Sequence, residues 1–166
     1  MTLTFSFAKH ETEVSKMLPQ NEMREFLTAF AGRIARMEEN ALSTGLDVRV
    51  TPPEIRIIEK IGPDGSAKMG NVARALGITL ATLTVACDKL EKKELVERRR
   101  DPHDKRTVCI SLTPRGLVAY RYHESFHQEL IGVMLKGLSA DEQRILMSGI
   151  RNLSQYLTRT EDGQKE

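Results

Sequence analysis

SAKMGNVARALGITLATLTVACDKLEKKEL, residues Ser66–Leu95, has the spacing of two short helices joined by a tight turn. Ser66 is a suitable N-cap for the first helix. The apolar residues of this helix recur in steps of three and four, which predicts one buried face. The residues of that face are Met69, Val72, Ala73 and Leu76.

Three consecutive residues mark the turn. Gly77 suits the left-handed conformation that closes a helix, Ile78 the apolar contact after it, and Thr79 the N-cap of the next helix. The second helix repeats apolar residues at helical spacing and leaves its other side polar; the repeated residues are Leu83, Ala86 or Cys87, and Leu90. This arrangement is typical of a helix-turn-helix.

After Leu95 the period changes from helical to extended. VERRR and TVCISL predict two short strands, the second rich in β-branched residues. Asp101-Pro102-His103-Asp104 forms the tip between them, so the ribbon is predicted to be a wing. Taken alone, the charges from Arg98 to Arg106 also fit a solvated hairpin edge, because charged residues discourage strand edges from aggregating.

Amphipathic helices are predicted on both sides of this central part. An apolar stripe in steps of three and four predicts a helix from Met17 to Ala41. Thr51-Pro52-Pro53-Glu54 is a capping box that begins the next helix, and Thr113-Pro114 begins one that ends near Leu135. Ser139-Ala140-Asp141-Glu142 is a second capping box. The expected fold is mainly α with a small β-wing.

Length and composition fit a soluble globular protein. The 166 residues favour a single domain, and 40% hydrophobic with 29% charged residues is ordinary. A net charge of +2 is too small to indicate a nucleic-acid partner by itself. The start MTLTFSFAKHE has no signal-peptide pattern, and no window approaches the run of about 18 apolar residues that a membrane span needs. We expect a cytoplasmic protein that has reduced thiols and does not bind a membrane.

The order of these elements, together with LTVACDKLEKKELVERR, DPHDKR and SLTPRG, resembles the MarR family of winged helix-turn-helix transcriptional regulators. The resemblance implies one MarR-type domain over 1–166. Within it, 51–113 is expected to form the winged helix-turn-helix, and 17–45 with 114–158 an all-helical dimerisation region.

The family resemblance also implies partners. It implies a homodimer that binds double-stranded DNA at a pseudo-palindromic operator and usually represses until a small-molecule ligand changes the spacing of its recognition helices. Three stretches together look closest to the fatty-acid-synthesis repressors of Gram-positive bacteria: IIEKIG, GITLATLTVACDKLEKKELVERR and HESFH. This resemblance implies an effector with an acyl chain on acyl carrier protein. Two residues depart from the family pattern. Glu94 stands where many relatives have glycine, and Val85 where many carry a polar or basic side chain.

The outward side of the second helix and the wing supply the candidate DNA contacts. Thr82 and Thr84 can bond to a base edge or phosphate, and Val85 can pack on a thymine methyl group. A basic ribbon has the size and charge to reach the minor groove, and the resemblance implies that Arg106 is the inserted side chain. Asp104 is expected to orient the turn or to brace an arginine. The predicted DNA-binding residues are Thr79, Ala81, Thr82, Thr84, Val85, Lys89, Arg98, Arg100, Asp104, Lys105 and Arg106.

His123-Glu124-Ser125-Phe126-His127 matches the H-E-x-x-H pattern of zinc proteases. Such a site would use both histidines as zinc ligands and Glu124 as general base. Third-ligand residues are missing at the expected downstream spacings, and the strands of a protease sheet are missing too. A zinc hydrolase is therefore a remote alternative, and we expect no enzyme, no cofactor and no bound metal.

Two other roles remain open for these histidines. A zinc-responsive regulator would need further zinc ligands from the region of the first helix. That region holds carboxylates such as Glu38, but its last histidine is His10. Alternatively, an acyl chain would lie between the first helix and this one, with Tyr120, His123, Phe126 and His127 as candidate ligand-binding residues. Packing within an all-helical dimer explains the same residues more simply.

Overall fold

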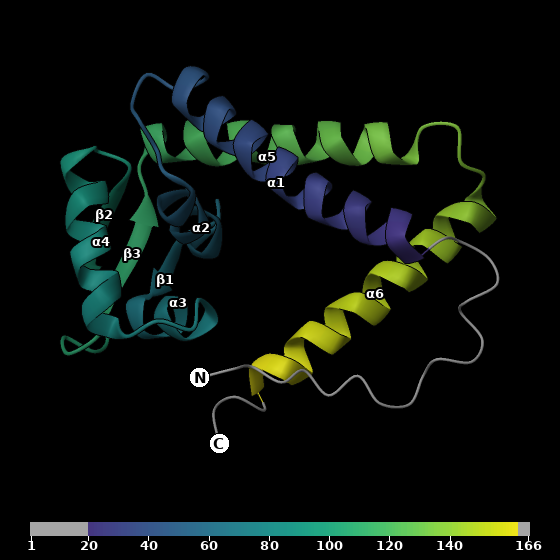
Figure 1. The fold of residues 1–166 in the computed structure, drawn as a ribbon. Coiled ribbons are helices and arrows are strands. Elements are labelled where there is room, and N and C mark those ends of the chain that lie inside the picture. Colours follow the sequence, from purple (N-terminus) through teal and green to yellow (C-terminus); the bar gives the residue numbers. More distant parts are fainter. Residues whose placement is uncertain (1–19, 163–166) are drawn as a thin grey trace, which may run out of the picture. The chain divides into compact units, whose positions relative to one another are not determined.

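The computed structural model describes residues 20–162. The chain forms two compact units, the first ending at His123 and the second beginning at Glu124. Its elements, shown in Figure 1, are α1 (Gln20–Thr44), α2 (Pro52–Ile61), β1 (Ser66–Lys68), α3 (Met69–Ala75), α4 (Leu80–Lys92), β2 (Val96–Arg100), β3 (Val108–Leu112), α5 (Pro114–Leu135) and α6 (Ala140–Asp162). The expected mainly helical fold with a small β-wing is confirmed. The predicted start of the first helix at Met17 lies outside the described residues.

The core of the first unit lies among α2, α3, α4 and the sheet. Ile55, Ile58 and Leu83 are completely buried there. The other core residues are Leu42, Val50, Ile57, Ile61, Met69, Val72, Ala73, Cys87, Leu90, Leu95, Val96, Ile110 and Ala119. The predicted buried face of α3 is confirmed for Met69, Val72 and Ala73, and Leu76 packs half-buried against the same core. Burial of this apolar surface is the main stabilising contribution to the unit.

The sheet has three antiparallel strands in the order β1-β3-β2. The prediction that Ser66 caps α3 was wrong, because Ser66 lies in β1 opposite Ser111 of β3. The helix instead begins at Met69 with Lys68 as its N-cap residue. The sequence did not predict β1, because three residues are too few to show a strand pattern. The predicted two-stranded wing is therefore part of a three-stranded sheet.

The second unit holds the end of α5 and all of α6. The predicted capping box at Ser139 is confirmed: its N–H donates to Glu142 at 2.8 Å, and the Glu142 N–H donates to the Ser139 hydroxyl at 3.4 Å. Eight large apolar side chains of this unit are exposed, namely Ile131, Val133, Met134, Ile145, Met147, Ile150, Leu153 and Tyr156. Exposed apolar stripes of this size are typical of helices that pack against another chain.

The helix α1 of the first unit has the same character, since the predicted apolar stripe carries five exposed side chains: Met23, Phe26, Leu27, Phe30 and Met37. Phe26 and Phe30 stack with their ring centroids 5.2 Å apart.

Among the described residues, no single helix is long and apolar enough to cross a membrane; only the bent pair of α3 and α4 meets that length and composition when taken together.

Candidate DNA interface

The helix α4 is held by its apolar face and exposes the opposite one. Leu83, Cys87 and Leu90 are completely buried, whereas Val85 is 58% exposed and Thr82 is exposed. The axes of α3 and α4 differ in direction by 108°, within the range of about 90–120° that is usual for a helix-turn-helix. The outward face is therefore free to enter a groove of matching width.

The turn before α4 has the predicted chemistry. Gly77 has φ +66°, and the Ile78 N–H donates to the Ala73 carbonyl at 3.0 Å, which closes α3. Thr79 accepts a hydrogen bond from the Thr82 N–H at 3.1 Å and so caps α4. The hydroxyls of Thr79 and Thr82 lie 2.8 Å apart on the exposed side.

Thr84 has less freedom than its neighbours on α4. Its side chain is half-buried, and its hydroxyl donates to the Leu80 carbonyl at 2.8 Å. Ala81, Thr82 and Val85 are exposed. These three residues, rather than Thr84, form the most accessible part of the predicted reading surface.

The turn after α4 places Glu94 in the left-handed conformation. This residue has φ +57°, and it is the only non-glycine residue with positive φ among those described. The Leu95 N–H donates to the Leu90 carbonyl at 3.0 Å across the turn. The fold thus uses a left-handed glutamate where glycine costs less.

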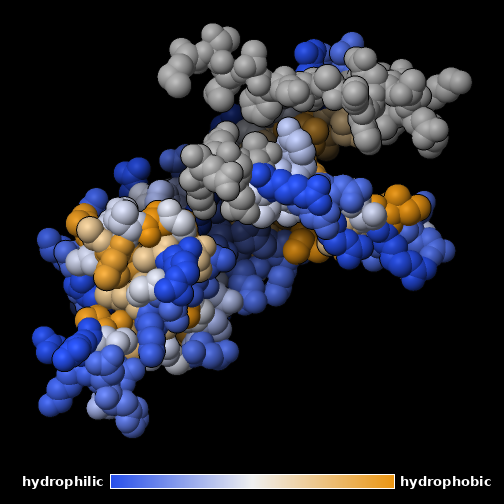
Figure 2. Space-filling view, turned by 90° about the horizontal axis from the view of Figure 1, so that it is seen from below, coloured by the Kyte–Doolittle hydropathy of each residue, from blue (hydrophilic) through white to orange (hydrophobic). Residues whose placement is uncertain are grey.

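The wing tip is fixed by its two aspartates. The Asp101 carboxylate accepts the N–H of His103 at 2.8 Å, while Asp104 accepts the N–H of Arg106 at 3.0 Å and the hydroxyl of Thr107 at 2.8 Å. Asp104 therefore orients the turn, one of its two predicted roles. The hydrogen bond from the His103 N–H lowers the pKa of Asp101. In Figure 2 the wing is the hydrophilic projection at the lower left.

Lys105 and Arg106 are exposed at this tip. Within residues 20–162, neither side chain has an ion-pair partner. Arg100, at the end of β2, is likewise exposed. The cations of the tip are therefore available to an anionic partner.

Arg98 lies differently from the other basic residues of the wing. Its guanidinium donates to Asp88 at 2.5 Å and also to Glu91, and its N–H donates to the other oxygen of Glu91 at 3.1 Å. The hydrogen bond with Glu91 raises the pKa of Arg98 and lowers that of Glu91. Arg98 thus ties β2 to the outward flank of α4.

A second cross-element bridge holds α4 to α2. Lys93 donates to both carboxylate oxygens of Glu54, at 2.7 and 2.8 Å, and to the Arg49 carbonyl at 2.8 Å. Burial raises the pKa of Glu54 most strongly, but the hydrogen bonds from Lys93 and Thr51 together outweigh it and lower the pKa. Capping of α2 by Glu54 was predicted; its bridge to Lys93 was not.

The candidate ligand-binding residues all lie on α5 but belong to different units. Tyr120 and His123 are in the first unit, and Phe126 and His127 are in the second. His123 is 2% exposed; its Nε2 lies 2.9 Å from Glu38 of α1 and its Nδ1 3.0 Å from Glu59 of α2. Glu59 was not predicted from the sequence, because its contact with His123, 64 residues further along the chain, depends on how α2 packs against α5.

Cys87 does not present a reactive thiol. Burial raises the pKa of its thiol to about 11, so the group stays protonated at neutral pH. It packs as a small apolar residue on the buried face of α4.

Comparison with known proteins decides the family. The model of the MarR family matches residues 50–108. The multiple antibiotic resistance protein MarR of Salmonella typhimurium is 32% identical over 108 residues, which cover 64% of this chain and 73% of the relative. The chain belongs to the MarR family.

Other MarR-type proteins agree over a larger part of the chain. The HTH-type transcriptional regulator YfiV of Bacillus subtilis is 25% identical over 159 residues, covering 95% of this chain and 97% of YfiV. The crystal structure of FabT from Streptococcus pneumoniae in complex with DNA matches with a TM-score of 0.78 and 28% identity, covering 86% of this chain and 99% of FabT. YfiV is named as a transcriptional regulator and FabT is seen bound to DNA, in agreement with the expectation of a regulator rather than an enzyme.

Proposed function

We propose that this MarR-family protein is a sequence-specific DNA-binding repressor that acts as a homodimer on a pseudo-palindromic operator. One observation carries the proposal: α4 buries its apolar face completely and exposes Ala81, Thr82 and Val85 in the same unit as a wing with unpaired cations. A helix presented in this way fits the major groove, and a basic ribbon fits the minor groove.

The residues divide into two kinds of contact. Thr82 and Val85 meet base edges, Val85 through a thymine methyl group, and Thr79 meets a phosphate beside the start of α4. Arg106 enters the minor groove, with Lys105 and Arg100 at the neighbouring phosphates. Arg98 acts indirectly, because Asp88 and Glu91 already occupy its guanidinium.

Separate variants test these two contacts. Val85→Ala should reduce discrimination at one base pair of each half-site, by about 1–3 kcal/mol for a good contact. Arg106→Ala should instead weaken binding and abolish any preference for narrow, A·T-rich flanks. Both are measured by titration of a footprinted operator and its base-substituted forms. Unchanged affinity and preference in both variants would show that α4 and the wing are not the reading surface.

We further propose that an effector with an acyl chain or another small apolar group controls the protein through α5. Half-buried Tyr120 and the buried His123 support this assignment in the first unit. Acyl thioesters of graded chain length, added to the operator complex, should change its affinity in either direction. An affinity that is independent of every chain length would reject an acyl effector.

A zinc-responsive regulator is the second candidate, because a buried histidine between two carboxylates offers nitrogen and oxygen ligands that suit zinc. His127 follows His123 by one helical turn on α5. Metal analysis after reconstitution with zinc separates the two candidates. Stoichiometric zinc that is lost in His123→Ala supports metal sensing, and no bound zinc rejects it.

A further inference from the structure

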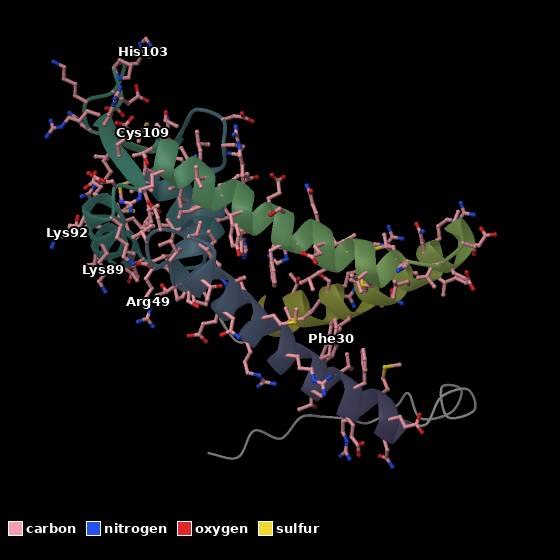
Figure 3. All side chains as sticks on the ribbon, turned by 90° about the horizontal axis from the view of Figure 1, so that it is seen from above. Phe30, Arg49, Lys89, Lys92, His103 and Cys109 are labelled. Carbon is pink, nitrogen blue, oxygen red and sulfur yellow. The ribbon has the colours of Figure 1, made fainter. Side chains whose placement is uncertain are left out.

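Three exposed cations lie together at the carboxyl-terminal end of α4, on the opposite side of the helix from the wing. They are Arg49, from the segment before α2, and Lys89 and Lys92 of α4. Figure 3 shows them next to one another, with their nitrogen atoms pointing away from the ribbon. Within residues 20–162, none of the three side chains has an ion-pair or hydrogen-bond partner.

The neighbouring acidic groups form ion pairs with cations other than these three. Lys93 pairs with Glu54 at 2.7 Å, and Arg115 pairs with Asp47 at 2.9 Å and with Glu94 at 3.4 Å. Asp88 and Glu91 both pair with Arg98. Arg49, Lys89 and Lys92 take no part in these ion pairs, so their cationic groups are available to an anionic partner at the surface.

Arg49 is held beside α4 without any ligand. The Lys93 ammonium donates to the Arg49 carbonyl at 2.8 Å while it binds Glu54, so the backbone at Arg49 is tied to the end of α4. Val50, the next residue, is buried at 3% exposure. The backbone from which the Arg49 side chain extends is thus fixed by the fold, so binding an anion there does not require ordering of that segment.

Lys89 and Lys92 also share a stripe with the proposed base contact. Val85, Lys89 and Lys92 are spaced by four and three residues, so they lie on one face of the helix. Lys92 lies about 10 Å along the axis from Val85, at 1.5 Å per residue. The major groove is about 12 Å wide. If Val85 lies over the bases, this stripe reaches the edge of the groove, where the phosphates are.

We propose that Arg49, Lys89 and Lys92, the α4 basic patch, bind the DNA backbone at the edge of the major groove that α4 enters. The inference rests on the proposed function and extends it by a phosphate-binding surface separate from the wing. It also assigns Lys89 to phosphate rather than to a base. The sequence pointed to Lys89 only, because Arg49 joins the patch through a tertiary contact.

A simpler role exists for the two lysines, since basic residues in the last turn stabilise a helix through its dipole. That role does not involve Arg49, which lies outside α4. It also predicts a change in stability without a change in the salt dependence of DNA binding. The two explanations therefore differ in a measurable quantity.

The test compares Arg49→Gln/Lys92→Gln with wild type in DNA titrations at several salt concentrations. Each lost phosphate contact lowers the slope of log affinity against log salt by about 0.9. Between about 50 and about 200 mM salt, wild type should therefore lose about 12-fold more affinity than the variant. The loss should be equal on operator and on unrelated duplex DNA, because phosphates carry no sequence information.

The matched control, Arg24→Gln/Arg33→Gln, removes the same two charges from exposed positions of α1, and sedimentation checks that both variants keep the wild-type oligomeric state. The control should keep the wild-type slope. An unchanged slope in the patch variant overturns the inference and leaves an acidic partner other than DNA as the explanation. Equal changes of the salt slope in the patch variant and the control also overturn the inference, because the loss of net charge alone would then explain the change. Wild type that binds no DNA would instead reject the proposed function itself.

Discussion

At the scale of single residues, Glu94 shows how the recognition helix is ended at a cost. Its φ of +57° is a conformation that costs non-glycine residues about 1 kcal/mol or more. Its ion pair with Arg115 contributes little stabilisation, since the Glu94 side chain is 79% exposed and lies 3.4 Å from the guanidinium. The residue is tolerated because Leu95, directly after it, is completely buried.

We expect Glu94→Gly to unfold with a free energy about 1 kcal/mol higher than Glu94→Ala. Both substitutions remove the contact with Arg115, and only glycine relieves the backbone. Denaturant unfolding at one fixed protein concentration measures the difference, because a dimer's stability depends on concentration. Equal stability of the two variants would mean that the left-handed conformation carries no strain.

Arg98 is a positioning residue for the same helix. The exchange Arg98→Glu/Glu91→Arg should recover much of the operator affinity that Arg98→Glu alone loses, because it restores an ion pair between β2 and α4 with reversed polarity. The salt slope should stay close to that of wild type in Arg98→Ala, since no phosphate contact is removed. A slope that falls by about one unit, without rescue by the exchange, would show that Arg98 contacts DNA directly.

At the scale of elements, α4 is placed by bridges on both sides. Arg98 fixes its outward flank to β2, and Lys93 fixes its end to Glu54 of α2. The wing tip is built independently through Asp101 and Asp104. The elements proposed to contact DNA are thus oriented without DNA.

The bridge between α2 and α4 predicts a dependence of stability on pH. Because the pKa of Glu54 in the folded protein lies below its ordinary value of 4.5, its carboxylate stabilises the fold above that pH. This contribution is lost as the pH falls through the lowered pKa. Thermal unfolding from pH 7 to pH 3 should show a smaller decrease in Glu54→Gln than in wild type. An equal decrease in the two proteins would show that the Glu54 carboxylate does not contribute to the pH dependence of stability.

Local sequence signals predicted most of these elements, for physical reasons visible at particular residues. Gly77, Thr79 and the capping box at Ser139 act within four residues, so their geometry follows from sequence alone. The pairing of Ser66 with Ser111 and of Arg115 with Asp47 depends on the path of the whole chain. For the candidate site, the exposed face of α4 and the tip of the wing were predictable, whereas the pairing of Arg98 and the place of Arg49 were not.

In the whole molecule, the exposed apolar side chains of α1 are the surface on which the proposed dimer depends. Figure 3 labels Phe30, which is 43% exposed on that helix. Phe30→Glu should shift the protein from dimer to monomer at micromolar concentration, because a charge in an apolar interface is desolvated without a partner. It should also weaken operator binding, since a monomer occupies one half-site. Sedimentation measures the first effect, with Asn40→Glu as a control for added charge at an exposed position of α1.

A wild-type monomer in the same experiment would contradict the dimer, and a monomeric Phe30→Glu variant with undiminished operator affinity would contradict its role in DNA binding. Dimerisation and DNA binding are linked in the proposed function, because the dimer must hold its two copies of α4 at the spacing of two half-sites, about one helical turn apart.

Whether α4 and the wing read DNA is tested by selection of genomic DNA fragments with the wild-type protein, followed by footprinting of the enriched sequence. We predict an inverted repeat with half-sites about 10 base pairs apart, centre to centre, whose enrichment is lost on combining Val85→Ala with Arg106→Ala. Recovery of fragments without a shared sequence, or of an inverted repeat that the double variant binds equally well, would contradict the claim that α4 and the wing read DNA.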